Sequence, residues 1–257
     1  MSAATYAYCV VAGERAPSLA KVPRGLPGTG APRLVACGER RWLVAADAPL
    51  DRFSSEALER GLRDLDWVSS CALAHEAVVE HFIGAEAVLP MKLFTLFSDD
   101  ARALEHLRRD RRAVERALAR VRGCVEWGVR VTIDSERAAK NARDAARKAA
   151  SGAESGAAFL LGKKAIAEAA RAVSRDGRKR VDEAHRALAA AADDARQRPP
   201  LDGAGRLLLD AAYLVPSGRG RAFRKSVADW EKRLAGDGLA LALTGPWPPY
   251  HFVGSAP

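Results

Sequence analysis

The sequence is poor in the residues that build disulfide frameworks and zinc knuckles. Its 257 residues include four cysteines, Cys9, Cys37, Cys71 and Cys124, and no two of them form a Cys-X-X-Cys pair. Cys9, Cys37 and Cys124 stand in apolar, strand-like segments, where cysteine usually acts as a small buried side chain. Because no secretory signal peptide is visible, we expect reduced thiols and a cytoplasmic protein.

Long apolar runs and common catalytic motifs are also missing. No stretch approaches the ~18–20 residues of a membrane-spanning helix, so we expect no membrane partner. There is no GxSxG motif, and His75 and His81 are six residues apart, whereas the zinc motif HExxH needs four. We interpret both histidines as ordinary polar residues on a helix surface. The segment 156–164 (GAAFLLGKK) departs from the phosphate-loop spacing. We therefore expect no catalytic, cofactor-binding or metal-binding residues.

Basic residues are in excess. The chain has 41 Lys and Arg against 32 Asp and Glu, a net charge of +9, yet residues 1–70 hold nine basic and eight acidic residues. The excess thus follows residue 70 and permits binding to nucleic acid or an acidic partner. A solvated helix surface rich in Arg and Ala also explains it, and we favour this explanation. A basic nucleic-acid-binding module is therefore the alternative function, although Cys124–Val131 (CVEWGVRV) lacks the RNP1 pattern of RNA-binding sheets.

Hydrophobic periodicity predicts a small α+β unit over residues 1–85. The expected elements are a strand over Thr5–Ala12, a hairpin of Leu34–Cys37 and Trp42–Ala46, a helix from Ser54 or Ser55 to about Leu65, and a helix from about Ser69 to Gly84. Leu73, Ala77 and Val78 form the predicted apolar stripe of the second helix.

The rest of the chain predicts a second domain over residues 86–245. Its expected elements are a strand over Ala87–Phe97 interrupted by Pro90, a helix to Arg122, a strand over Cys124–Ile133, a strand over Arg206–Val215, a helix over Ser217–Leu234 and a strand over Leu239–Leu243. This is the β-α-β, β-α-β order of a ferredoxin-like unit. A long helical insertion, about residues 135–198, is rich in Ala and separates its second and third strands.

The C-terminal segment, residues 246–257, combines proline with aromatic residues. Three prolines in four residues forbid a helix, and such dense aromatic residues are untypical of disorder. The rings are buried either against this chain, which we prefer, or against a partner. The candidate partner-contacting residues are Trp247, Tyr250 and Phe252 of this tail and Lys163 and Lys164 of the insertion. A solvated helix face also explains the two lysines, and we favour this explanation.

Several segments resemble one protein family, the gas vesicle proteins GvpL/GvpF. They are, in chain order, Tyr6–Val11 (YAYCVV), Ala74–Val79 (AHEAVV), Val88–Phe97 (VLPMKLFTLF), Glu126–Val131 (EWGVRV), Gly162–Lys164 (GKK) and Thr244–Val253 (TGPWPPYHFV). Together they span nearly the whole chain, and the combination is specific. Small departures are Cys9, where the family often has Gly, and Lys92-Leu93, where Arg-Phe is usual.

The resemblance implies a non-enzymatic accessory protein of gas vesicle formation, located at the gas vesicle. It implies an α+β fold of two domains, the second a modified ferredoxin-like unit. It also implies contact with the small, very hydrophobic shell protein GvpA and with other gas vesicle proteins. A shell subunit exposes apolar surface before it assembles, so a helper needs apolar grooves or free sheet edges to cover that surface.

Overall fold

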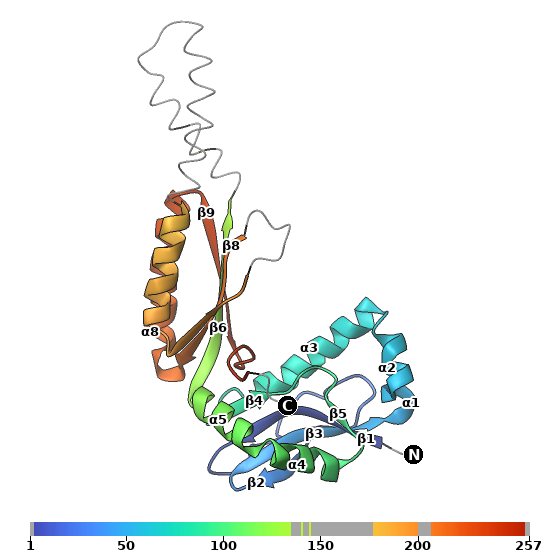
Figure 1. Ribbon diagram of the computed structural model, residues 1–257. Coiled ribbons are helices and arrows are strands. Elements are labelled where there is room, and N and C mark those ends of the chain that lie inside the picture. Colours follow the sequence, from blue (N-terminus) through green and yellow to red (C-terminus); the bar gives the residue numbers. More distant parts are fainter. Residues whose placement is uncertain (1–2, 135–139, 141–143, 145–176, 200–206, 255–257) are drawn as a thin grey trace, which may run out of the picture. The chain divides into compact units, whose positions relative to one another are not determined.

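The computed structural model describes residues 3–134, 140, 144, 177–199 and 207–254. The chain divides into two compact units, which combine helices with antiparallel strand pairing (Figure 1). Unit 1 is Met1–Glu126 together with Pro246–Pro257, and unit 2 is Trp127–Gly245. The expected mixture of helices and antiparallel strands is therefore confirmed.

The sheet of unit 1 is built around its first strand. The strands are β1 (Ala3–Ala12), β2 (Arg33–Gly38), β3 (Arg41–Pro49), β4 (Ala87–Pro90) and β5 (Leu96–Phe97), in the order β2-β3-β1-β4, with β5 also paired to β1. All these pairings are antiparallel. The predicted hairpin is confirmed as β2 and β3. The predicted strand over 87–97 is split into β4 and β5, and β4 ends at Pro90, which cannot donate to the sheet ladder.

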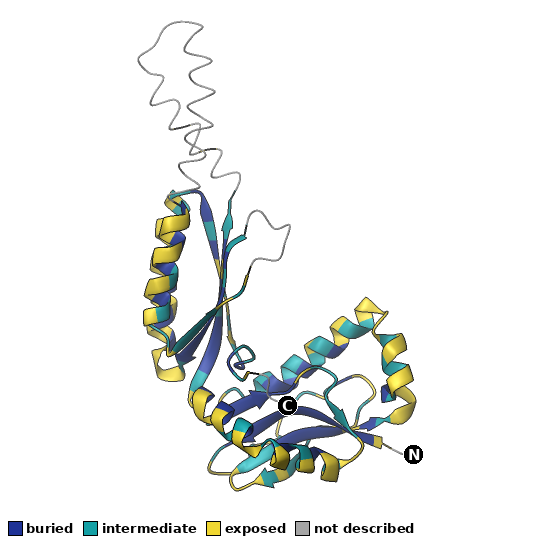
Figure 2. Ribbon diagram, viewed as in Figure 1, coloured by how far each residue is buried: buried dark blue, intermediate teal, exposed yellow. Residues whose placement is uncertain are grey.

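Strand β1 is buried along nearly its whole length because helices cover both faces of the sheet (Figure 2). The helices are α1 (Leu50–Phe53), α2 (Ser55–Gly61), α3 (Leu65–His81), α4 (Asp100–Arg109) and α5 (Arg111–Val121). On one face, Tyr6 and Tyr8 of β1 pack in a core with Val78 and Val79 of α3. Helices α4 and α5 contact β1, β2 and β4.

Polar side chains define where the helices of unit 1 begin and end. Asp64 accepts hydrogen bonds from the backbone of Asp66 and Trp67 and caps α3. Helix α3 therefore begins earlier than the predicted start near Ser69. The predicted stripe is also rotated, because Leu73 is 69% exposed while Cys71 and His75 face the core. The single helix predicted up to Arg122 is two helices, α4 and α5, separated at Asp110.

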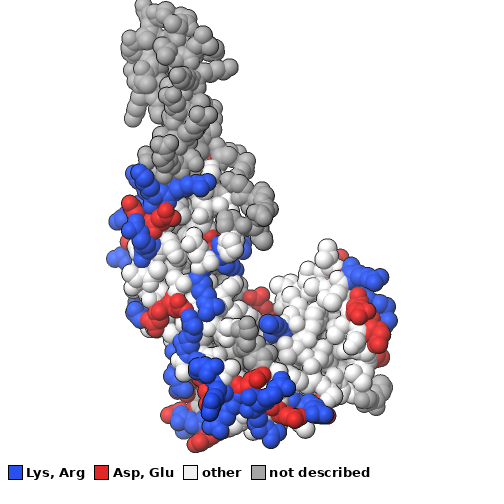
Figure 3. Space-filling model, viewed as in Figure 1, with Lys and Arg blue, Asp and Glu red and all other residues white. Residues whose placement is uncertain are grey.

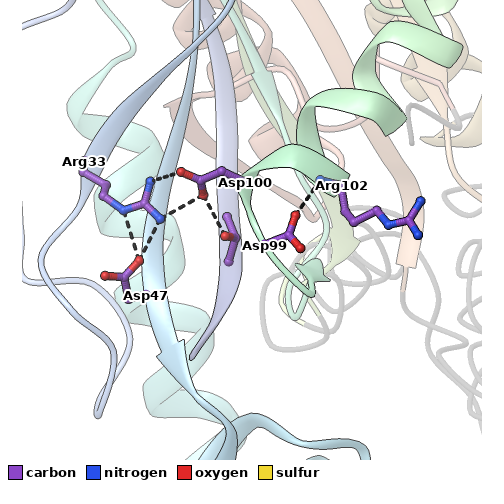
Figure 4. Close-up of polar contacts among 6 residues, drawn as sticks. Arg33, Asp47, Asp99, Asp100 and Arg102 are labelled. Carbon is purple, nitrogen blue, oxygen red and sulfur yellow. Dashed lines mark hydrogen bonds and ion pairs between the residues drawn. The ribbon is translucent and has the colours of Figure 1, made fainter. Parts of the chain in front are cut away.

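An ion-pair network ties α4 to the sheet of unit 1 (Figure 4). Arg33 of β2 donates to both oxygens of Asp100 at 2.8 and 2.9 Å and to Asp47 of β3 at 2.7 Å. The hydroxyl of Thr5 in β1 also donates to Asp100, at 2.7 Å. Strands β2 and β3 and helix α4 thus meet at the Arg33 guanidinium, and β1 joins them through Asp100. The hydrogen bonds from Arg33 lower the pKa of the Asp100 carboxyl.

Unit 2 has a four-stranded sheet in the order β7-β8-β6-β9. Its elements, in chain order, are β6 (Cys124–Ile133), a helix whose described part is 177–190, β7 (Asp194–Gln197), β8 (Leu207–Pro216), the short 3₁₀ turn η1 (Ser217–Arg219), α8 (Gly220–Gly236) and β9 (Leu239–Trp247). Both helices lie on the same side of the sheet (Figure 1). This is a strand-helix-strand-strand-helix-strand order.

The elements that carry this order differ from the predicted ones. The expected first strand and first helix, over residues 87–122, belong to unit 1, because β4 pairs with β1 through Cys9 and Pro90. The division between units follows Glu126, not residue 85. Within the expected insertion, 135–198, the part over 177–190 is a helix of unit 2, and β7 is a strand that the sequence did not reveal. Residues 135–139, 141–143 and 145–176 of the insertion lie outside the described residues.

Trp127 and Gly128 are neighbours in β6, and each meets a different packing requirement of unit 2. The Trp127 ring is buried beneath α8, with its centroid 6.3 Å from that of Phe223. A Cβ at Gly128 would lie 2.5 Å from Oγ1 of Thr244 in β9. Trp127 is thus a core residue beneath a helix, and Gly128 allows the close approach of the Thr244 side chain.

Candidate partner-binding site

Unit 1 contains an apolar cavity of about 400 Å³ beside α3. Ala72, His75 and Glu76 of α3 form one wall, and residues that follow β4 form a second. The third wall is the C-terminal segment, which the chain reaches after returning from unit 2. The lining residues are Ala72, His75, Glu76, Pro90, Met91, Lys92, Leu93, Tyr250, Val253 and Gly254.

Three of the segments that resemble the GvpL/GvpF family meet at this cavity. Ala74–Val79 contributes His75 and Glu76, and Thr244–Val253 contributes Tyr250 and Val253. Val88–Phe97 contributes the four consecutive residues 90–93 (PMKL). These segments are far apart in the sequence, and the sheet of unit 1 and the return of the chain bring them together. The cavity is therefore our candidate partner-binding site.

His75 holds the first two walls together from beneath. Its side chain is buried; Nδ1 lies 2.7 Å from the Tyr6 hydroxyl and Nε2 lies 3.2 Å from the Met91 carbonyl. A carbonyl only accepts, so Nε2–H donates to Met91, and Nδ1 accepts from the Tyr6 hydroxyl. The Tyr6 oxygen in turn accepts the backbone N–H of Phe94 at 3.3 Å. Burial lowers the pKa of His75 to about 4, so the ring is neutral at pH 7.

The interpretation of His75 as a helix-surface residue was therefore wrong. The alternation of β1 places Tyr6 and Tyr8 on the face that α3 covers, and the Tyr8 ring stacks on His75 with centroids 5.5 Å apart. The Tyr8 hydroxyl accepts the backbone N–H of Leu26 at 3.0 Å. This network fixes the loop that carries Met91. The partly buried His81 contacts the Ser18 carbonyl through Nε2 at 3.2 Å.

The C-terminal segment forms a tight turn in unit 1. The N–H of Tyr250 donates to the carbonyl of Pro248 at 2.8 Å, and the N–H of Phe252 donates to that of Pro249 at 3.1 Å. Both prolines are buried, and Phe252 is 1% exposed. The segment therefore packs within the chain, as preferred from its composition.

Glu126 fixes this turn at its far end. Its carboxylate accepts the backbone N–H of His251 at 2.8 Å and lies 2.5 Å from Nδ1 of the same residue. The Glu126 side chain is buried, and a buried carboxylate needs such partners because an unpaired one costs several kcal/mol. Glu126 is not among the contact residues predicted from the sequence. The signal available was an acidic residue in an otherwise apolar strand.

Charge is distributed unevenly at the cavity. Glu76 lines it, and Glu80 follows one turn later on α3; neither has a cation within ion-pair distance among the residues that the structure describes. Burial and the neighbouring Glu76 raise the pKa of Glu80. Lys92 is exposed on the opposite wall. The hydroxyl of Tyr250 is buried without a hydrogen-bond partner, and its pKa is raised mainly by burial.

The structure separates the five predicted contact residues. Tyr250 lines the cavity, Trp247 is partly buried at the end of β9, and Phe252 is buried and so does not present its ring to a partner. Lys163 and Lys164 lie outside the described residues. The structure thus brings Tyr250 together with His75, Glu76 and Met91, which were not among the predicted contact residues.

Acidic side chains compensate part of the basic surface of α4 and α5. Arg102 pairs with Glu105 at 2.8 Å, and Arg111 pairs with Glu115 at 2.8 Å. Arg122 pairs with Glu86. Acidic side chains therefore stand among the arginines over these helices (Figure 3).

Among the residues that the structure describes, no three His, Cys, Asp or Glu side chains are grouped so that they could hold a metal ion. None of the described helices combines the length and the hydropathy that a bilayer crossing requires.

These features define a two-unit α+β protein whose first unit carries an apolar cavity. The family model of the gas vesicle synthesis proteins GvpL/GvpF matches residues 4–254. Gas vesicle protein L of Streptomyces sp. (strain CB03234) is 32% identical over 247 residues, which cover 91% of this chain and 88% of that protein. The chain therefore belongs to the GvpL/GvpF family, and the resemblance seen in the sequence is confirmed.

Solved structures agree on the fold. The crystal structure of the gas vesicle protein GvpF from Anabaena sp. PCC7120 is similar with a TM-score of 0.69 at 15% identity, covering 100% of both chains. GvpF from Microcystis aeruginosa gives a TM-score of 0.66 at 15% identity, covering 97% of this chain and 98% of that one. At such identities the likeness concerns the fold alone.

Proposed function

We propose that this protein is a non-enzymatic accessory protein of gas vesicle formation that binds the shell protein GvpA and other gas vesicle proteins. The observation that carries the proposal is the match of the GvpL/GvpF family model over residues 4–254. The protein works at the gas vesicle in the cytoplasm. Its second unit is a ferredoxin-like fold in which the helix over 177–190 serves as the first helix of the unit.

The physical support for a binding role is the apolar cavity of unit 1. A subunit that builds a gas-filled wall has to expose apolar surface before assembly, and exposed apolar surface aggregates. An apolar cavity with a few polar groups at its rim suits the burial of such surface. The histidine beside the cavity supports a binding role over acid–base catalysis, because both ring nitrogens of His75 are engaged and its pKa is about 4.

Co-expression tests the proposal. The tagged protein is co-expressed with GvpA, the complex is isolated, and floating vesicles are fractionated from a strain that carries or lacks the gene. Capture of GvpA and loss of vesicles in the deletion strain are the expected results. Normal vesicles in the deletion strain, together with no capture of GvpA, would overturn the proposal.

The alternative of a nucleic-acid-binding module predicts a different result. Its affinity for an oligonucleotide would fall steeply with salt, because neutralised phosphates release counterions. The ion pairs of Arg102 and Arg111 with glutamates reduce the positive charge available on α4 and α5. We expect no binding of a random single-stranded probe of about 20 nucleotides at low ionic strength. Such a probe is longer than the ~4–16 nucleotides that one single-strand-binding domain covers.

A further inference from the structure

The apolar wall of the cavity continues along the exposed side of α3. Leu65 and Ala72 are seven residues apart, two turns of the helix, and therefore lie on one face; Leu65 is 77% exposed and Ala72 lines the cavity. Leu73, beside Ala72, is 69% exposed. In the space-filling view the surface over α3 is largely uncharged, while Lys, Arg, Asp and Glu gather over α2 and over α4 and α5 (Figure 3).

The length of this surface indicates the kind of occupant. From Leu65 to Glu76 the helix rises roughly 16 Å at ~1.5 Å per residue, which is longer than a small ligand in a cavity of about 400 Å³. An amphipathic segment that lays its apolar side along a groove covers such a length. A large apolar side chain inserted between Met91, Leu93 and Val253 would anchor it.

The charges at the rim specify the polar side of the occupant. Glu76 and Glu80 are one turn apart on α3, a like-charge arrangement that is unfavourable unless a cation is added. Both carboxylates lie close enough to the Tyr250 hydroxyl to raise its pKa, and Glu126 does the same. Lys92 is the basic side chain among the residues that line the cavity. The rim is therefore acidic, although the chain as a whole is basic.

We propose that the cavity binds a basic amphipathic segment of a protein partner, which inserts an apolar side chain beside Tyr250 and places a Lys or Arg against Glu76 and Glu80. The inference rests on the proposed function in that the partner is a gas vesicle protein. It goes further by specifying the binding surface and the chemistry of the segment that the surface recognises.

A pair of model peptides tests the chemistry directly. Both are amphipathic helices with one leucine face; one carries lysines on its polar face and the other carries glutamates at the same positions. We expect the lysine peptide to bind the full-length protein at low ionic strength, measured by fluorescence anisotropy, and the glutamate peptide to bind at least about tenfold more weakly. Equal binding of the two peptides would overturn the proposal.

Variants locate the binding. Glu76→Gln/Glu80→Gln should weaken binding of the lysine peptide about fivefold, the size expected for two partly exposed charge pairs. The matched control is Asp51→Asn/Glu59→Gln, at exposed positions of α1 and α2, which should leave the affinity unchanged. Equal loss in both double variants would mean that the effect is one of net charge and would overturn the assignment to the cavity.

Filling the cavity provides a test that does not depend on charge. Ala72→Phe places a ring at the mouth of the cavity from a half-buried position and should abolish peptide binding. Ala101→Phe, at an exposed position of α4, is the control and should bind as the unchanged protein does. Circular dichroism and the melting temperature verify that both variants are folded. Undiminished binding by a folded Ala72→Phe variant would overturn the proposal.

Co-expressed GvpA separates this inference from the proposed function. Capture of GvpA by the unchanged protein and equally by Ala72→Phe would overturn the cavity as the contact, while the proposed function would stand. Specific binding of the lysine peptide without any capture of GvpA would support the cavity chemistry and count against GvpA as the partner. Concentration-dependent self-association that Ala72→Phe abolishes would identify a second copy of this chain as the occupant and overturn the proposal.

Discussion

Glu126 and His251 are 125 residues apart in the sequence, and the Glu126 carboxylate contacts His251 twice, at the backbone N–H and at the ring nitrogen Nδ1. Glu126 is the last residue before the chain passes into unit 2, and His251 follows the return of the chain. One buried carboxylate thus fixes the C-terminal turn, and with it the wall of the cavity that contains Tyr250.

Removing this carboxylate should release the turn. We expect Glu126→Ala to lower the free energy of unfolding by about 3 kcal/mol, since it deletes two hydrogen bonds to a buried charge. Glu126→Gln keeps an acceptor for the His251 N–H and should lose about half as much. Urea unfolding measures both changes. Chymotrypsin should cut after Tyr250 or Phe252 faster in Glu126→Ala, and an unchanged cutting rate would contradict the role of Glu126.

Stability should depend on pH through His75. The pKa of this side chain is about 4 in the folded protein against 6.5 ordinarily, so the folded state binds fewer protons than the unfolded state between these values. Stability is therefore fully present above pH 6.5 and falls as the pH drops towards 4, by at most about 3 kcal/mol. Urea unfolding at a series of pH values measures the slope. His75→Phe should flatten the slope in this window, whatever its absolute stability.

The network of Arg33 should contribute at a different pH. The pKa of Asp100 is lowered by its hydrogen bonds to Arg33, so this contribution is present above the ordinary carboxyl value and is lost as the pH falls through the lowered one. The Asp100 side chain is 40% exposed, so solvent screening keeps the loss in Asp100→Asn at pH 7 to about 1 kcal/mol. Asp47→Asn is the control with a smaller expected loss, because that carboxylate is 62% exposed.

Gly128 and Thr244 should behave as a coupled pair. A Cβ at position 128 would lie 2.5 Å from Thr244 Oγ1, so Gly128→Ala should destabilise by about 1–3 kcal/mol through overpacking. Thr244→Ala removes the obstructing atom, and the double variant should recover most of the loss. Gly218→Ala is the matched control, because its Cβ meets nothing within 4 Å. Additive losses in the thermal unfolding of the double variant would contradict the contact.

The aromatic residues of the C-terminal segment should differ in their contributions. Phe252 is 1% exposed, and Phe252→Ala should cost about 3–5 kcal/mol, as truncations of buried aromatic side chains do. Trp247 is only partly buried, so Trp247→Ala should cost less and leave the cavity intact. Differential scanning calorimetry of the two variants tests this ranking, and the reverse order would contradict the packing of the turn.

Local patterns in the sequence predicted most strands and helices, because alternation and helical periodicity depend on neighbours in the chain. Strands β1, β3 and β6 were recognised from their β-branched and aromatic residues. Strand β7, with the sequence Asp-Ala-Arg-Gln, has no apolar alternation and forms because it pairs with β8, for example through Ala195 and Tyr213. Pairing of this kind leaves no local signal.

The division into units required long-range information. Strand β4 has the sequence AVLP, which fits either domain equally well by composition, and its pairing with Cys9 and Val10 of β1 decides the matter. The cavity could be predicted only in part. The tail was identified by its prolines and rings, but the roles of His75 and Glu126 follow from burial against Tyr6 and His251, partners far away in the sequence.

The two units differ in whether they consist of one segment of the sequence or of two. Unit 2 is one continuous segment, Trp127–Gly245, whereas unit 1 combines Met1–Glu126 with Pro246–Pro257. The second of these segments supplies the third wall of the cavity. On a translating ribosome the sheet and helices of unit 1 emerge early, but Tyr250 and Val253 are added only after all of unit 2 has been made. A half-made chain therefore lacks the third wall of the cavity, and the cavity can be complete only after all of unit 2 has been made.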